Sequence, residues 1–105
     1  MVYTMVNKMY ESAVEIERSM RLAKRAALRQ DPVPLLVLKR IAEVEEILDT
    51  QKKLALKTAD YLSNGQFDEV HRATRLISGF STMIHDDARQ ILEAVGMPTL
   101  LERRA

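Results

Sequence analysis

Residues 2–27 read VYTMVNKMYESAVEIERSMRLAKRAA, and the spacing of their apolar side chains decides the fold class. Apolar residues recur there at alternating spacings of four and three, at Val2, Val6, Met9, Ala13, Ile16, Met20, Ala23 and Ala27. This heptad rhythm is typical of a long helix that packs against a neighbour at a shallow angle along its whole length. Strand-like alternation is missing here and in the later segments, so the sequence predicts an all-α protein.

Glycine and proline residues divide the chain into three long segments within a single helical domain. The predicted helices span residues 3–30, 32–63 and 67–95, within a domain of residues 1–105. Asp31 can cap the second helix, whose first turn tolerates the prolines that follow it. Asn64 and Gly65 form a favourable left-handed stop for that helix. Residues 98–105 are expected to form a short C-terminal turn or helix.

Short connections between long helices force neighbouring helices to run antiparallel, which predicts an up-down-up three-helix bundle. A helix of about 28 residues is roughly 42 Å long at 1.5 Å per residue. The bundle is therefore expected to be slender and to bury little of its apolar surface. We therefore expect a homodimer to complete the core. The expected interface residues are Tyr3, Val6, Met9, Tyr10, Leu35, Leu36, Leu38, Gly79 and Phe80.

The composition argues against several classes of partner and compartment. The net charge is +1, so strong non-specific attraction to nucleic acid or anionic lipid is not expected. The chain has no cysteine, which removes disulfides and thiolate metal sites. Its first residues do not form a signal peptide, and no apolar run approaches the ~20 residues of a bilayer span. We expect a cytoplasmic protein that does not associate with membranes.

The segment Ser78–Asp87, SGFSTMIHDD, places a glycine, a histidine and two aspartates inside the third predicted helix. Glycine there costs about 1 kcal/mol relative to alanine, which predicts that Gly79 lies at a close helix crossing. Asp87 interrupts the apolar rhythm and is expected to pair with an arginine of a neighbouring helix and fix the register. No nucleophile or oxyanion donor accompanies His85, so we interpret the segment as a packing surface and expect neither catalysis nor a cofactor.

Acidic residues on the first two helices suggest an alternative function. Glu46-Ile47-Leu48-Asp49 resembles the Glu-x-x-Asp motif of the all-α nucleotide pyrophosphohydrolases of the MazG-like family. That resemblance implies a divalent-metal site, for which Glu15, Glu46 and Asp49 are the candidate ligands. The Glu-Glu-x-x-Glu motif of the family is missing, and a solvated face with pairs such as Asp49 and Lys53 explains the same residues.

A second alternative rests on four arginines that form one stripe on the first helix, at Arg18, Arg21, Arg25 and Arg29. Such a stripe is a possible anion-binding or nucleic-acid-binding surface. Basic residues also stabilise a helix C-terminus, and glutamates of the second helix, such as Glu43 and Glu46, are expected within reach. We favour this structural interpretation.

The sequence as a whole favours a binding protein over an enzyme. The methionines at apolar helical positions adapt to varied partners. The hypothesis is therefore a small non-enzymatic regulator, adaptor or chaperone-like protein that presents a helical face or groove to an unidentified protein partner.

Overall fold

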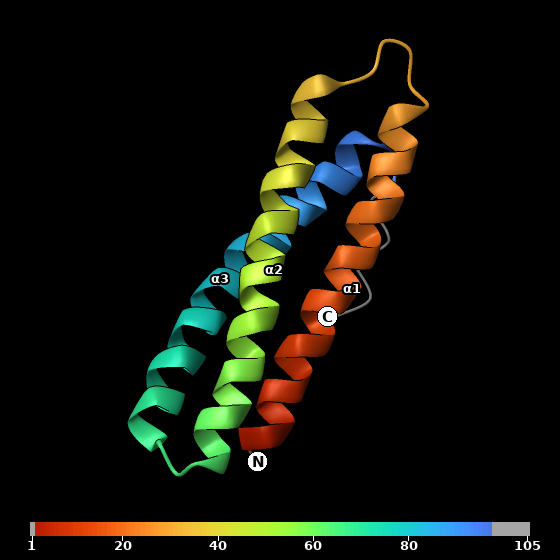
Figure 1. Cartoon of the computed structure of the whole chain (residues 1–105). Coiled ribbons are helices and arrows are strands. Elements are labelled where there is room, and N and C mark those ends of the chain that lie inside the picture. The colour runs from red at the N-terminus through yellow and green to blue at the C-terminus, as the bar shows by residue number, and fades with distance from the viewer. Residues whose placement is uncertain (1, 98–105) are drawn as a thin grey trace.

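The computed structural model describes the backbone of residues 2–97 and the side chains of residues 4–97. Three helices follow one another, α1 (Val2–Leu28), α2 (Leu35–Ser63) and α3 (Phe67–Ala94). They pack antiparallel in an up-down-up bundle, in which the end of α3 comes close to α1 and α2 (Figure 1). The bundle measures 53 × 25 × 17 Å. The predicted all-α architecture is confirmed, whereas dimerisation remains a prediction.

The heptad seam of α1 forms one side of the core, as its spacing predicts. Six of its members are buried, at Val6, Ala13, Ile16, Met20, Ala23 and Ala27. Met9 is half-buried, and the side chain of Val2 lies outside the described residues. Three of the six are alanines, which let the neighbouring helices approach α1 closely.

The start of α2 differs from the prediction. This helix begins at Leu35 rather than at residue 32, and Asp31 does not cap it; the residue at the cap position is Pro34, without a side-chain hydrogen bond. The physical reason is that a residue before proline disfavours the helical conformation, which applies to both Asp31 and Val33. The segment between α1 and α2 is consequently a longer connection than the sequence suggests.

The predicted stop at Asn64 and Gly65 is confirmed in detail. Gly65 adopts the left-handed conformation with φ 71°. The Gln66 N–H donates to the Tyr61 carbonyl at 2.9 Å, and the Gly65 N–H donates to the Leu62 carbonyl at 3.2 Å. These two bonds satisfy carbonyls at the end of α2 and reverse the chain into α3.

The core of the bundle consists of two apolar clusters along its axis. The larger cluster includes Met20, Leu48, Ile84 and Ile91, and the smaller comprises Val6, Ala55 and Ile77 with partly buried neighbours. Buried Ala88, rather than half-buried Asp87, continues the seam of α3 into the larger cluster.

Two expectations fall beyond what the structure describes. The predicted C-terminal turn or helix at residues 98–105 lies outside the described residues, as does the side chain of Tyr3. Among the described helices, none combines the length and the apolar composition that a membrane span requires.

Candidate functional site

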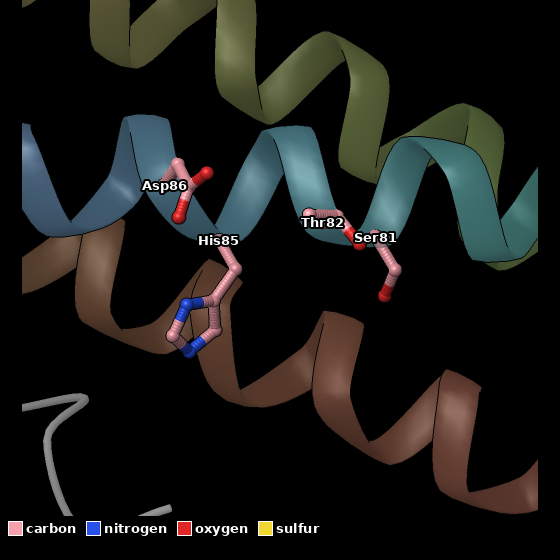
Figure 2. Close-up of a pocket in the computed structure, with 4 residues that line it drawn as sticks. All are labelled: Ser81, Thr82, His85 and Asp86. Carbon is pink, nitrogen blue, oxygen red and sulfur yellow. The ribbon is translucent and has the colours of Figure 1, made fainter.

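The polar segment of α3 lines a shallow recess of about 340 Å³, formed by Ser81, Thr82, His85 and Asp86. Ser81 and His85 extend toward α1 but do not point at each other (Figure 2). No hydrogen bond joins any two of these four side chains in the described part of the chain. The recess therefore holds no hydrogen-bonded pair of nucleophile and base, which is the arrangement that activates a hydroxyl for catalysis.

Gln51 of α2 forms a polar layer in the core next to this recess. Its side chain is only 2 % exposed and lies between Leu48 of the larger cluster and Ala55 of the smaller one. The Gln51 Nε2 group donates to Ser81 Oγ at 3.4 Å, and Oε1 has no hydrogen-bond partner among the described residues. A buried acceptor without a partner is costly, so Gln51 is a weak point of the core. Sequence patterning missed it because glutamine is ordinarily a surface residue.

The predicted partner of Asp87 is present. Asp87 Oδ1 lies 3.7 Å from a guanidinium nitrogen of Arg40 on α2, and the same arginine donates to Gln90 Oε1 at 3.0 Å. Both charged side chains are substantially exposed, so the pair contributes little to stability. It does tie the register of α2 to that of α3.

A second ion pair joins α1 to α2. Lys52 Nζ donates to Glu17 Oε2 at 2.9 Å, and both side chains are about one-quarter exposed, at 23 % and 28 %. The hydrogen bond to Glu17 is the main cause that raises the pKa of Lys52 above its ordinary value of 10.5. Glu17 also accepts a weaker contact at 3.6 Å from Arg21 of its own helix.

The candidate metal ligands do not assemble into a site. Among the described residues, no group of three or more histidine, aspartate or glutamate side chains is placed to hold a metal ion. Asp49 instead binds Lys53 one turn along α2, at 2.9 Å. The described part of one chain therefore does not bring Glu15, Glu46 and Asp49 together as a metal-binding group.

The arginine stripe is exposed along its whole length. Arg18, Arg21 and Arg25 are exposed on α1, and Arg29 is exposed directly after its end. Of these four arginines, only Arg21 forms an ion pair within the described residues, and its partner is Glu17 of the same helix. Among the described residues, neither Glu43 nor Glu46 forms an ion pair with this stripe, and Arg25 and Arg29 have no ionic partner there.

The structure divides the residues that were expected to form an interface. Val6 is buried inside the bundle, and Met9, Tyr10, Leu38 and Phe80 are half-buried against the core. These residues complete the core of one chain. The expected role of Val6 as an intermolecular contact is therefore wrong, because its seam faces α2 and α3.

Gly79 does not lie at a helix crossing among the residues that the structure describes. It is exposed, and a Cβ atom added there would meet nothing within 4 Å. The described residues therefore supply no helix for the expected close crossing, because Gly79 lies almost opposite Ile77 around α3, away from the buried seam. The expectation that Gly79 belongs to an interface stays a prediction.

The described apolar residues exposed most strongly lie at the turn between α1 and α2. Leu35 and Leu36 are 74 % and 78 % exposed, and Leu28 and Val33 are exposed beside them in the chain. We call this group, together with Arg25, Arg29 and Lys39, the hairpin-end surface. The turn caps one end of the long axis of the bundle (Figure 1).

The hairpin-end surface belongs to a strongly basic segment of the chain. Residues 18–40 contain seven lysines and arginines and one acidic residue, Asp31, although the whole chain has a net charge of only +1. Sequence analysis identified its leucines and its arginines separately. Spacing alone does not show which of these side chains remain exposed in the folded chain.

Comparison of this chain with protein families, curated proteins and solved structures finds no match.

Proposed function

We propose that this protein is a small non-enzymatic binding module, of the adaptor or regulator type, that binds a partner protein through the hairpin-end surface. The observation that carries the proposal is the exposure of Leu35 and Leu36 in the first turn of α2. Exposed leucines are common singly, but two adjacent leucines are exposed here and Leu28 and Val33 are exposed in the same segment of residues 28–36. A concentration of exposed apolar side chains is typical of an interaction site.

The magnitude of apolar burial supports a binding role. Burial of one leucine side chain is worth about 1.5–3 kcal/mol, so Leu35 and Leu36 together offer roughly 3–6 kcal/mol before the cost of association. Association costs at least about 4 kcal/mol, so the leucines alone give weak binding. The surrounding cations supply the remaining attraction and orient the partner.

The charges indicate the chemistry of the partner. Arg25 and Arg29 have no ionic partner in the described part of the chain, and Lys39 is exposed on the next helix. An amphipathic helix with one leucine-rich face and acidic flanks complements both features at once. We therefore assign the partner as an acidic amphipathic segment of another protein.

A protein partner explains the surface better than a nucleic acid or a lipid bilayer does. Nucleic acid would use the arginines but not the leucines, and none of residues 18–40 is aromatic to stack on a base. A flat anionic bilayer would also press against the exposed carboxylate of Asp31 at the turn. A peptide helix can lie beside that carboxylate without covering it.

The test uses fluorescent synthetic peptides of one amphipathic design, with acidic flanks, with basic flanks, or with the same residues scrambled. Fluorescence anisotropy should show that the wild-type protein prefers the acidic amphipathic peptide. The Leu35→Ser/Leu36→Ser variant and the Arg25→Glu/Arg29→Glu variant should each lose this preference. Leu56→Ser is the control, because Leu56 is 59 % exposed on α2 outside the turn.

Three results would contradict the proposal. One is equal binding of the acidic and scrambled peptides, and another is an equal loss of binding in the Leu56→Ser control. The third is tighter binding to a single-stranded oligonucleotide or to phosphatidylserine vesicles than to any peptide, which would assign the surface to one of those ligands.

A further inference from the structure

Helix α3 carries a second heptad seam on its exposed side. Its members are spaced by four and three residues, at Arg72, Leu76, Gly79, Met83 and Asp86, and we call it the outer seam. All five residues are exposed, and Leu76 and Met83 are 55 % and 47 % exposed. The bundle uses a different seam of α3, which includes Ile77 and Ile84. The outer seam is therefore a helix-packing pattern without a partner among the residues that the structure describes.

Gly79 at the centre of the outer seam has no close neighbour among the described residues that would explain it. A glycine in a helix interior is less favourable than alanine, and here a Cβ atom would have free space around it. Glycine becomes useful where another backbone must approach closely. The missing side chain therefore points to a second helix that crosses α3 at this position.

The charges of the outer seam identify that second helix. Arg72 lies seven residues before Gly79, and Asp86 lies seven residues after it. We propose that the outer seam packs antiparallel against the outer seam of a second copy of this chain, about a two-fold axis at Gly79. In that arrangement Arg72 of each copy faces Asp86 of the other copy, and Leu76 packs near Met83 of the other copy.

The existing contacts of these charges are compatible with the dimer. Asp86 has no ion-pair partner among the described residues. Arg72 contacts Glu69 of its own helix at 3.0 Å, but this pair is exposed and is readily exchanged or shared. A parallel arrangement would instead place like charges together at both ends of the seam. A two-fold axis also uses the same surface on both copies, as closed dimers require.

The dimer has a geometric consequence for the molecule. Because the two copies of α3 run in opposite directions, the two hairpin-end surfaces lie toward opposite ends of the assembly. The dimer contact uses residues of α3, whereas the hairpin-end surface is formed by residues of α1, α2 and the turn between them. The dimer is thus independent of the proposed binding function and would make the module bivalent.

Sedimentation equilibrium of the full chain over a range of micromolar concentrations tests the dimer. Leu76→Glu should weaken dimerisation by at least about tenfold, because it places a charge in the apolar contact. Arg72→Asp and Asp86→Arg should each weaken it by a similar factor, and the double variant should restore it. Leu56→Glu is the matched control, because Leu56 has a similar exposure of 59 % on a different helix.

The orientation is tested by disulfide cross-linking, because the chain has no native cysteine. Gly79→Cys should cross-link to itself near the axis. Arg72→Cys should not cross-link to itself, but should cross-link to an Asp86→Cys chain when the two variants are mixed.

Each alternative outcome overturns the proposal. If the protein is monomeric at every concentration, the proposed dimer does not exist. If Arg72→Cys cross-links to itself, the two helices run parallel rather than antiparallel. A dimer that is insensitive to Leu76→Glu but dissociates with Leu36→Glu places the contact at the hairpin-end surface. Circular dichroism of each variant distinguishes lost association from lost folding.

Discussion

Replacement of Gln51 with leucine should stabilise the protein, because the amide oxygen of Gln51 is buried without a hydrogen-bond partner. The side chain is 2 % exposed and lies between the two apolar clusters of the core. Its one contact, from Nε2 to Ser81 Oγ, is 3.4 Å long, which is beyond the usual range for a strong N–H···O bond. The substitution removes an unsatisfied acceptor and gives up a weak bond.

The expected gain follows from these opposing effects. An unsatisfied buried acceptor costs about 1–3 kcal/mol, and a hydrogen bond this long lies at the low end of a net worth of about 0.5–1.5 kcal/mol. Leucine also adds apolar contacts to both clusters. We expect the free energy of unfolding to rise by about 1–2 kcal/mol, which corresponds to an increase in Tm of roughly 5–10 °C for a domain of this size.

Urea denaturation followed by far-UV circular dichroism measures this gain at a fixed protein concentration. Thr58→Val is the control, because Thr58 is also fully buried on α2 but its hydroxyl donates to the Leu54 carbonyl at 2.7 Å. That variant should show no comparable gain. If Gln51→Leu lowers stability while Thr58→Val leaves it unchanged, the Gln51 oxygen is satisfied in solution and the reasoning is refuted.

Three further predictions concern contacts of single residues. Gly79→Ala should raise the stability of the monomeric chain by about 1 kcal/mol, measured by urea denaturation at a concentration too low for association; unchanged or lower stability would reveal a contact at this position. The pKa of Lys52 is raised above 10.5 mainly by its hydrogen bond to Glu17. The stabilising effect of protonated Lys52 should therefore be complete below pH 10.5 and disappear as the pH rises through the raised pKa. The Tm of Lys52→Met should therefore differ from that of the wild type at pH 8, and the two should converge above the raised pKa of Lys52. A difference that stays constant with pH would assign the effect to packing. Asp87→Asn should cost no more than about 1 kcal/mol in urea denaturation, because its pair with Arg40 is exposed; a larger loss would show that the pair is coupled to the core.

The heptad rhythm of α1 made the fold predictable, because one seam has to face the rest of the bundle. Val6, Ile16 and Met20 were identified from spacing alone, and all are buried. The end of α2 at Gly65 is equally predictable from the sequence, because glycine is the residue that most readily adopts the left-handed conformation.

The functional surfaces were harder to predict because they depend on which face of each helix remains free. Gly79 was assigned to a crossing because glycine in a helix usually accompanies one, yet its face turns toward solvent. Val6 was assigned to an interface, although a three-helix bundle already buries it. Spacing identifies a seam but does not say which helix, or which chain, packs against it.

The polar contacts of α2 explain how apolar seams of such regular spacing select one register. A heptad seam alone permits α3 to slide by seven residues along α2 at little cost in apolar contact. Two polar contacts oppose this slide, one from Arg40 to Asp87 and the other from Gln51 to Ser81. They lie at different levels of the bundle, so they constrain the position of α3 along α2 and its rotation.

A slide of one heptad would break these contacts without replacing both. The position of Asp87 opposite Arg40 would be taken by Phe80 or Ala94, and neither residue can accept a hydrogen bond through its side chain. In the direction that brings Ala94 to Arg40, Gln51 would face Ala88 and would lose its partner as well. Gln51 thus lowers the stability of the observed register by less than it would lower that of the register in which Ala94 faces Arg40. Its retention in the core is consistent with a contribution to specificity rather than to stability.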